Sequence, residues 1–308
     1  MNVCKLSASA IKSYKFCPFQ YLMSYLLEFE PQSGKAAVLG SIVHQVFEWI
    51  GLLVKRGKTI DVEWLIDRAW DMYIENNAHL GLKRVNRNGE SADFRLCRTS
   101  VNAVLSSPLY NPWTLNILDV EKRFDISMPG IAWTTPSGQF RITGYIDMVH
   151  EINPDTVEIV DWKTGRRTDY GSMKQKDFYD MMSDAQARIY HFAANQLYPK
   201  YKNILVTFYY INDGGPITLP YSVDDMIMTV GALWRIFKKI QTEELVTRSV
   251  SWKCSKFCQF GRMRVCDSIW KDFSDHNLAF VADKYRKMSL EKQQEYKEDN
   301  NGNIRTTS

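Results

Sequence analysis

The sequence has 308 residues, of which 45% are hydrophobic and 24% are charged, the composition of an ordinary soluble globular protein rather than a disordered or fibrous one. Lysine and arginine number 39 against 35 acidic residues, so the net charge of +4 neither requires nor excludes nucleic acid as a partner. We find no secretory signal and no stretch approaching about 18 apolar residues. We therefore expect no membrane span and a cytoplasmic protein, either bacterial or viral and acting inside the host cell.

Helical spacing of apolar residues dominates the first third of the chain. Segments 6–29, 40–50, 62–74 and 101–105 carry apolar side chains three and four positions apart, which predicts amphipathic helices. His44 and Glu48 stand four apart in the second segment and therefore share one helix face. We accordingly expect a helical N-terminal region over 1–114.

After residue 114 the pattern changes to that of strands. β-rich runs at 115–126, 139–151 and 157–163 are separated by short turns rich in Pro, Gly and Asn, which predicts an antiparallel meander. A helix over 177–197, a strand over 204–211 and a helix over 223–244 are expected to follow. We place a core domain at 115–245, a cysteine-bearing segment at 246–289 and a flexible tail at 290–308.

Two carboxylates and a lysine fall on neighbouring strands of this meander. Asp161 and Lys163 are two apart on one strand, so both project from the same face, and Asp147 lies on the polar face of the preceding strand. Side by side, the two carboxylates repel each other unless a cation lies between them, and hard oxygen ligands suit Mg²⁺ or Mn²⁺. A lysine beside such a metal could orient water and stabilise charge on a phosphate. On spacing alone, a solvated strand end with ordinary surface acids is the alternative interpretation.

Four short motifs follow one another along the chain. They are Gly40-Ser-Ile-Val-His44, Gly144-Tyr-Ile-Asp147, Asp161-Trp-Lys163-Thr-Gly and Gln186-Ala-Arg-Ile-Tyr190. This ordered set resembles the RecB-like branch of the PD-(D/E)XK nuclease superfamily. The resemblance implies an α/β fold with a restriction-endonuclease-like core, in which helices flank a mixed central sheet.

The resemblance also implies roles for individual residues. It implies that His44, Asp147 and Asp161 bind Mg²⁺ or Mn²⁺ with help from the carbonyl of Trp162, and that Asp147, Asp161 and Lys163 are catalytic. Gln186 and Tyr190 share one helix face and are expected to bind substrate through phosphate oxygens. The alternatives are a packed or exposed helix histidine and ordinary polar residues on the later helix.

Four of the six cysteines form a pattern of one distant residue and a group of three: Cys17, Cys254, Cys258 and Cys266. Four thiolates can hold either a [4Fe–4S] cluster or a structural zinc. The arrangement resembles iron–sulfur members of the same branch, such as the AddB helicase–nuclease, exonuclease V and the CRISPR-associated iron–sulfur nuclease. The resemblance implies a C-terminal segment that closes a [4Fe–4S] cluster with Cys17. Cys4 and Cys97 lie outside the pattern and are expected to be buried thiols.

We therefore expect a metal-dependent DNA exonuclease acting on single strands or DNA ends, in repair, recombination or replication. Basic and aromatic residues interleave after Lys163 and around the later cysteines, as single-stranded DNA would require. The sequence shows no nucleotide-binding phosphate loop, so a helicase or recombination protein is a candidate partner. The alternative is a non-catalytic, iron–sulfur-stabilised DNA-binding or scaffold protein with a vestigial nuclease site, and an RNA-directed enzyme is a third interpretation.

Overall fold

The structure is a computed structural model that describes residues 4–29, 33–128, 130, 133–135, 138–169, 172–222, 224–242, 247–276, 280–281 and 283–285. The chain forms two compact units. Unit 1 comprises Met1–Ala8 and Ser33–Thr242, and unit 2 comprises Ser9–Gln32 and Glu243–Ser308. The tail expected at 290–308 lies outside the described residues, and the domain boundaries drawn from the sequence stay predictions.

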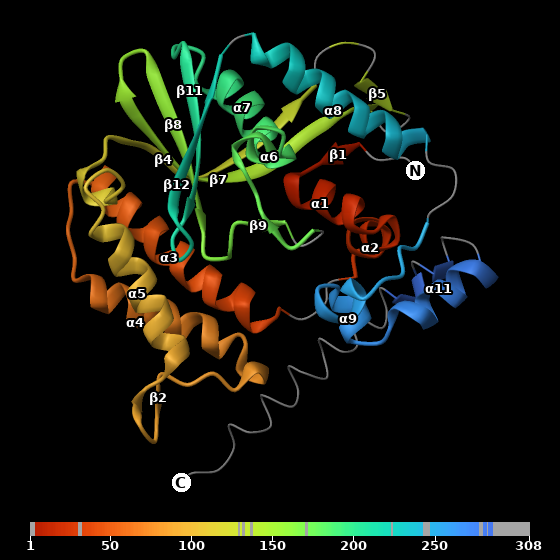
Figure 1. The fold of residues 1–308 in the computed structure, drawn as a ribbon, viewed down its shortest axis with the longest axis horizontal. Helices are drawn as coiled ribbons and strands as arrows, with labels where there is room; N and C mark the ends of the chain where they lie inside the picture. Colours follow the sequence, from red (N-terminus) through yellow and green to blue (C-terminus); the bar gives the residue numbers. More distant parts are fainter. Residues whose placement is uncertain are drawn as a thin grey trace. The chain divides into compact units, whose positions relative to one another are not determined.

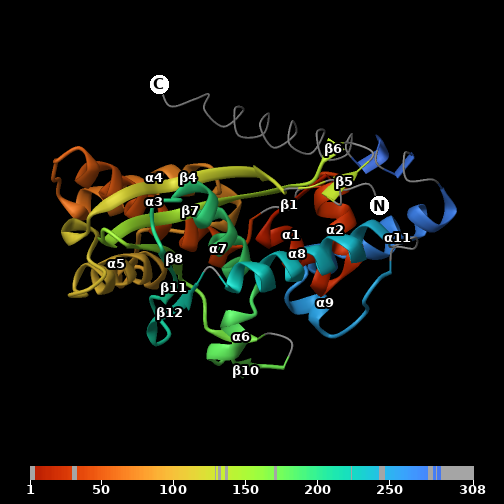
Figure 2. The same cartoon turned by 90° about the horizontal axis from the view of Figure 1, so that it is seen from above.

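Unit 1 is built on a six-stranded sheet. Its strands are β1 (Lys5–Leu6), β4 (Ile117–Ser127), β7 (Arg141–Asn153), β8 (Thr156–Lys163), β11 (Asn203–Tyr210) and β12 (Gly215–Tyr221). The order is β1-β7-β8-β11-β12, with β4 paired to β7 (Figure 1). Figure 2 shows β4 and β7 running side by side as long strands.

Strand directions confirm the expected meander and a mixed sheet. β7 is antiparallel to both β4 and β8, whereas β11 runs parallel to β8 after a crossover that contains α6 (Phe178–Met182) and α7 (Ala185–Leu197). A parallel pair needs such a long connection, and a helix commonly supplies it. The mixed central sheet flanked by helices agrees with the fold class expected from the sequence.

β8 is buried on both faces, because helices cover both sides of the sheet. Val160 and Trp162 pack into a core with α3 (Lys35–Lys55), α4 (Val62–Glu75) and α5 (Ala92–Leu105). Asp161 points to the opposite face, since side chains alternate along a strand, and its partners there come from α7. α8 (Asp225–Thr242) packs against α7.

α3 is long and apolar enough to cross a membrane by length and composition, although the sequence predicted no such segment. Half of that apolar window is buried inside the protein. Its fully buried side chains include Ile42, Val46 and Ile50, which pack in the core with α4, α5 and the sheet. Core packing therefore accounts for the apolar composition of α3.

Two of the predicted elements differ in the structure. The helix expected over 177–197 is divided into α6 and α7, because Asp177 and Asp184 each accept a backbone hydrogen bond at the start of a separate helix. β12 was not predicted, because Pro216 and Pro220 interrupt the apolar pattern. These prolines are tolerated because β12 pairs only with β11 and lies at the edge of the sheet.

Smaller elements complete unit 1. They are the hairpins β2–β3 (Val85–Asn86 and Gly89–Glu90), β5–β6 (Thr134–Thr135 and Gly138–Gln139) and β9–β10 (Thr168–Asp169 and Lys174–Gln175), and the turns η2 (Ala78–Leu80) and η3 (Pro112–Thr114).

Unit 2 joins residues from the two ends of the chain. Its helices are α1 (Ala8–Phe16), α2 (Pro18–Tyr21), η1 (Leu22–Leu26), α9 (Lys253–Lys256), α10 (Gln259–Arg262) and α11 (Cys266–Asp275). Phe19 is fully buried, and its ring packs edge-on against Trp270 with the ring centres 4.8 Å apart. The amide of Phe19 also donates to the carbonyl of Thr247 over 3.1 Å. Apolar packing and backbone hydrogen bonds thus tie α2 to the C-terminal segment.

Candidate active site

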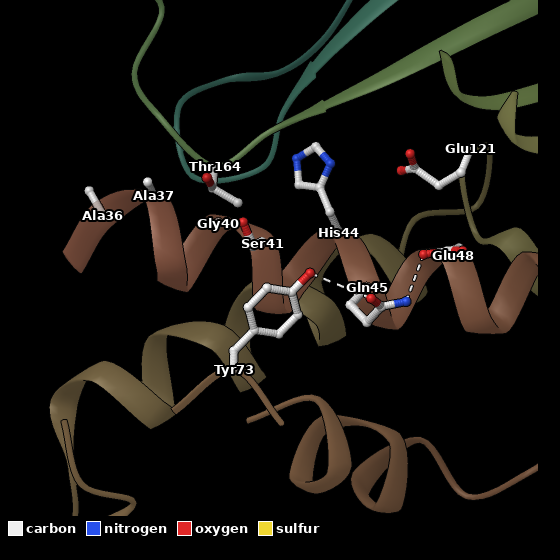
Figure 3. Close-up of a pocket in the computed structure, with 10 residues that line it drawn as sticks. All are labelled: Ala36, Ala37, Gly40, Ser41, His44, Gln45, Glu48, Tyr73, Glu121 and Thr164. Carbon is white, nitrogen blue, oxygen red and sulfur yellow. Dashed lines mark hydrogen bonds between the residues drawn. The ribbon is translucent and has the colours of Figure 1, made fainter. Parts of the chain in front are cut away.

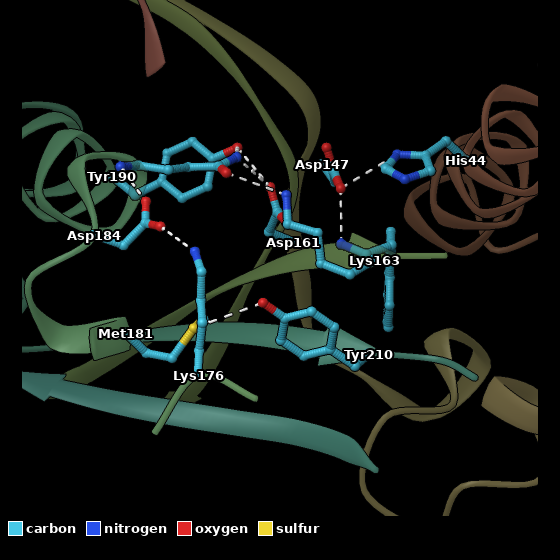
Figure 4. A network of polar contacts seen from close by, with 11 residues as sticks. His44, Asp147, Asp161, Lys163, Lys176, Met181, Asp184, Tyr190 and Tyr210 are labelled. Atoms are coloured by element: carbon cyan, nitrogen blue, oxygen red, sulfur yellow. Dashed lines mark hydrogen bonds and ion pairs between the residues drawn. The ribbon is translucent and has the colours of Figure 1, made fainter. Parts of the chain in front are cut away.

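Asp147 and Asp161 lie where β7 and β8 separate. The last pair between these strands is Met148 with Val160. Asp147 precedes Met148 and Asp161 follows Val160, so both acids lie just beyond this pair. The amide of Trp162, just beyond the last pair, donates a hydrogen bond of 2.8 Å to Asp147 Oδ2. The two carboxylates are therefore neighbours at the end of the ladder (Figure 4).

Lys163 forms an ion pair with Oδ2 of Asp161, whose side chain is almost fully buried. Burial disfavours the charged ammonium, but Asp161 and Asp147 outweigh this effect and hold the pKa of Lys163 above its ordinary value. Its Nζ also donates to Gln186 Oε1 over 3.1 Å. Lys163 is therefore a fixed cation beside two carboxylates.

Two side chains of α7 hold the second oxygen of Asp161. Gln186 Nε2 donates to Asp161 Oδ1 over 2.7 Å, and the Tyr190 hydroxyl donates to the same oxygen over 2.8 Å. Gln186 and Tyr190 also contact each other over 2.9 Å, as their spacing on one helix face requires. The predicted contact of both residues with phosphate oxygens stays a prediction, and in the structure both donate to Asp161, as Figure 4 shows for Tyr190.

His44, Glu121 and Asp147 form a set of potential metal ligands. One ligand atom from each residue lies within 4.8 Å of the others. His44 Nδ1 is 3.3 Å from Asp147 Oδ2. One imidazole and two carboxylates are donors that Mn²⁺ and Mg²⁺ accept, so the residues present fit a divalent cation.

The acids of this set repel one another. Burial and the neighbouring Asp161 raise the pKa of Asp147 to about 6. Burial, Asp147 and Glu48 raise the pKa of Glu121 to about 7. A cation among these carboxylates would remove the repulsion, which is a physical reason for the site to bind one.

A hollow of about 370 Å³ lies beside these ligands. His44 and Glu121 reach it from α3 and β4, and Tyr73 lines it from α4 (Figure 3). Glu48 adds a further carboxylate to the wall and accepts a hydrogen bond of 2.6 Å from Gln45. The hollow is acidic and large enough for a cation with its water and a phosphate group.

Sequence reasoning missed Glu121. It lies on β4 between Val120 and Lys122, whose partners on β7 are Met148 and Ile146, so it faces Asp147 across the ladder. Its backbone has φ 44°, a left-handed conformation uncommon for a residue other than glycine. The register of β4 against β7 could have identified it, because the residue opposite a candidate ligand on the next strand lies near that ligand.

All four cysteines of the predicted cluster lie in unit 2. The amides of Ser249 and Ser251 each approach a sulfur, those of Cys17 and Cys254, over 3.4 Å. The thiol of Cys258 is close enough to those of Cys17 and Cys254 for their charges to raise its pKa, although burial has the larger effect. Burial also raises the pKa of the Cys266 thiol, against the effect of Arg248, and Cys258 and Cys17 add smaller contributions in the same direction as burial. Ser249 thus contacts cysteines from both ends of the chain, since its carbonyl also accepts a hydrogen bond of 3.3 Å from the Cys254 thiol.

Gly261 keeps the loop between two of these cysteines tight. A Cβ on Gly261 would stand 2.3 Å from the carbonyl oxygen of Cys254, a distance that real Cβ atoms do not adopt. Cys97 is instead buried in the core of unit 1, where burial raises the pKa of its thiol to about 12. Cys4 is also in unit 1, where it is only half-buried, so the prediction of a buried thiol is wrong for this residue. Its carbonyl accepts from the amide of Arg141.

The profile of the PD-(D/E)XK nuclease superfamily matches residues 5–267. The chain belongs to this superfamily. Nucleases of the PD-(D/E)XK superfamily use divalent metals, and the His44–Glu121–Asp147 set of this nuclease is a candidate site for one.

The nuclease is also similar to individual proteins. One component of an ATP-dependent helicase/deoxyribonuclease, found in two strains of Clostridium perfringens, is 25% identical over 185 residues, which is 54% of this chain and 16% of that one. This nuclease therefore spans only a small part of the curated relatives that it matches.

Two solved structures are similar at 12% identity. A candidate exonuclease from Eubacterium rectale has a TM-score of 0.45, covering 82% of this chain and 93% of that one. The protein SSO0001 has a TM-score of 0.36, with 84% and 85% covered.

Proposed function

We propose that this PD-(D/E)XK nuclease is a metal-dependent DNA exonuclease that hydrolyses phosphodiester bonds of single strands or DNA ends. The observation that carries the proposal is the ion pair between Lys163 and the buried Asp161, next to the His44–Glu121–Asp147 set. Phosphodiester hydrolysis needs an activated water and cationic groups around the phosphate. The site offers the Lys163 cation and a set of ligands for a divalent ion that would activate the water.

His44, Glu121 and Asp147 would hold Mg²⁺ or Mn²⁺. Asp161, which the sequence predicted to be a ligand with His44 and Asp147, is not part of this set, and its two oxygens contact Lys163, Gln186 and Tyr190. When bound, the ion would lower the pKa of a bound water and polarise the phosphate. Besides the metal ligands, the chain contributes the side chains of Asp161 and Lys163 to the site. The Lys163 ammonium would face the charge that builds on the phosphate during in-line attack, and Asp161 keeps it charged and oriented.

Gln186 and Tyr190 act as positioning residues in this proposal. They donate two hydrogen bonds to one oxygen of Asp161, so its other oxygen is directed at Lys163. Gln186 also accepts from Lys163 and thereby restricts the ammonium group. Their substitution should weaken catalysis by loosening Asp161 and Lys163, rather than by removing a phosphate contact.

We further propose that Cys17, Cys254, Cys258 and Cys266 hold a [4Fe–4S] cluster in unit 2. The amides near Cys17 and Cys254 suit charged sulfur ligands, and the close backbone at Gly261 fits a compact cysteine loop. Ligands from both chain ends would make the cluster a covalent link within unit 2. A helicase is a candidate partner, since the relative from Clostridium perfringens is part of a helicase/deoxyribonuclease.

The proposal is tested with end-labelled linear and circular single-stranded DNA in Mg²⁺, Mn²⁺ and chelator. We expect metal-dependent release of nucleotides from the linear strand and none from the circle. Lys163→Ala should reduce the rate by about 100-fold to 1,000-fold, the effect of removing one charge-stabilising donor. Lys202→Ala is the matched control, because Lys202 pairs with Asp155 in an exposed position.

Three outcomes would contradict the proposal. Cleavage by Lys163→Ala at the wild-type rate would remove Lys163 from the active site. Cleavage of the circle as fast as the linear strand would make the enzyme an endonuclease. DNA binding without cleavage in either metal would favour the scaffold interpretation.

A further inference from the structure

A second hollow in unit 1 adjoins the candidate metal site. It has a volume of about 270 Å³ and lies between α3, α5 and the loop after β8. Ala36, Gly40 and Thr164 line both hollows, so the two hollows share a wall that includes the residue directly after β8. Figure 3 shows these three residues along the metal-site side of that wall.

The second hollow differs in chemistry from the first. Leu39, Val43 and Leu96 give it apolar sides, whereas the metal-site hollow is lined by carboxylates. The polar part of the lining consists of Thr164, the ion pair of Lys35 with Asp93, and a second pair formed by Ser100 and Asn212. The Asn212 amide nitrogen donates to Ser100 Oγ over 3.0 Å, and the Ser100 hydroxyl donates to Asn212 Oδ1 over 3.2 Å. Ser100 is buried and Asn212 is exposed. The hollow therefore combines apolar walls with one edge that carries both hydrogen-bond donors and acceptors.

A nucleobase has this same combination of a flat apolar face and a polar edge. We infer that the hollow binds one nucleobase of the substrate strand, next to the phosphate under attack. The inference rests on the proposed nuclease function and deepens it. The volume of about 270 Å³ lies just below the roughly 300–1,000 Å³ of ligand pockets, which suits a single base better than a larger cofactor.

The surroundings of the hollow fit a nucleic acid strand. Lys35 stands at the rim in an ion pair of 2.8 Å with Asp93, and its side chain is 57% exposed. Because an exposed ion pair contributes little stability, Lys35 can turn to a backbone phosphate at small cost. The amide group of Asn212 can hydrogen-bond more than one base edge, as a nuclease that degrades mixed sequences requires.

The first test uses strands that lack one base. An abasic residue is moved one position at a time along an oligonucleotide, and single-turnover cleavage is measured at each phosphodiester. We expect one position beside the scissile phosphate to slow wild-type cleavage about tenfold, the scale of one lost base–protein contact. The Leu96→Ala/Asn212→Ala variant should cleave the intact strand about as slowly as the wild type cleaves the strand that lacks this base. In this variant, removing the base should not slow cleavage further.

The matched control is Asn102→Ala/Leu109→Ala. Asn102 lies on α5 and Leu109 follows it, both are exposed, and neither lines the hollow. This control should keep the full penalty for the missing base. Two results would overturn the inference. One is that the wild type cleaves every abasic strand at the same rate. The other is that the missing base slows the Leu96→Ala/Asn212→Ala variant by the same factor as it slows the wild type.

A second test separates this inference from the proposed function. The fluorescent base 2-aminopurine is placed at the sensitive position and bound to Lys163→Ala in Ca²⁺, so that no cleavage is needed. Its fluorescence should change on binding, and the change should vanish when Leu96→Ala and Asn212→Ala are added. A fluorescence change without any cleavage by the wild type would contradict the nuclease proposal alone. Cleavage with neither a fluorescence change nor an abasic penalty would contradict the base-binding hollow alone.

Discussion

Gly40 on α3 lies so close to Thr164 that a Cβ on Gly40 would stand 2.9 Å from Thr164 Oγ1. This contact fixes the distance between the helix that carries His44 and the strand that carries Lys163. The glycine of the first motif thus has a packing role beside the metal site, because a larger residue would push α3 away from the end of β8.

Gly40→Ala should reduce nuclease activity about tenfold, because misplacement of α3 by a fraction of an ångström moves His44 relative to Asp147. The double variant Gly40→Ala/Thr164→Ala removes the hydroxyl that the new methyl group would meet, and we expect it to recover most of the activity. Single-turnover rates of the three proteins test this. If Thr164→Ala made the loss worse, the contact would not be the cause.

The acids of the metal site should make the metal-free protein less stable as the pH rises. The pKa of Glu121 is raised to about 7 and that of Asp147 to about 6, so the folded state keeps protons that the unfolded state releases near pH 4. The unfolded state binds fewer protons in this range, and stability therefore falls between about pH 4 and pH 7.

Glu121→Gln should flatten this dependence, because the amide does not ionise. We expect the melting temperature of the chelator-treated wild type to fall by at least about 2–4 °C between pH 5 and pH 7.5, and that of the variant to fall less. Mg²⁺ should raise the melting temperature of the wild type more at pH 7.5 than at pH 5, since binding requires ionised acids. A melting temperature that rises with pH in chelator would contradict the assignment.

The shared faces of the motif residues were predictable, because they follow from the regular spacing of side chains along a strand or a helix. Strand alternation placed Asp161 and Lys163 on one face, and helical spacing placed Gln186 and Tyr190 together. Glu121 was not predictable in this way, because its proximity to Asp147 depends on the pairing of β4 with β7 and on its own left-handed backbone. The roles of Gln186 and Tyr190 as supports of Asp161 depend on how α7 packs on the sheet, which no local pattern contains.

The part of the fold that depends on local sequence was predictable as well. Turn residues delimited β4, β7 and β8, and the meander followed from short connections. β12 escaped because two prolines interrupt it, and only its place at the sheet edge makes them acceptable. Unit 2 joins Cys17 to residues beyond 246, and sequence periodicity carries no information about contacts over such a distance.

A buried contact between a histidine and a glutamate in unit 1 should be sensitive to the loss of one partner. His150 Nε2 lies 2.8 Å from Glu158 Oε2, and both side chains are almost fully buried. Burial opposes the charge of Glu158, but hydrogen bonds from His150 and Thr207 outweigh it and lower the pKa of this acid. Glu158→Leu should cost about 3–5 kcal/mol, because it leaves the histidine unpaired.

The double variant His150→Leu/Glu158→Leu should cost less than the sum of the two single variants, because it removes the histidine together with its acidic partner. Urea unfolding of the four proteins measures this coupling. Below the unfolding transition, each variant should retain its cleavage rate, since neither residue contacts the metal-site ligands. Strict additivity would show that the pair is not coupled.

Cys17→Ser should remove iron and acid-labile sulfide from protein purified without oxygen. It should also expose residues 9–29 and 247–285 to proteases, because the cluster would link these two segments of unit 2. Cys97→Ser is the control, since Cys97 is buried in unit 1 and distant in sequence from the other cysteines. Full iron content in Cys17→Ser would exclude Cys17 as a ligand, and stoichiometric zinc in the wild type would replace the cluster with a zinc site.

Unit 2 has a consequence for how the protein is made. The amide of Ser249 meets the sulfur of Cys17 across 232 residues of chain, while unit 1 is nearly complete once residue 242 has been synthesised. At roughly 5–20 residues per second, α1 and α2 leave the ribosome about 10–50 s before their partners exist. During that interval Phe19 and Leu22, which end up fully buried, have no C-terminal segment to pack against. The growing chain therefore passes through a stage in which the apolar side chains of its first helices lack their final partners, and unit 2 closes only when the segment after residue 246 has left the ribosome.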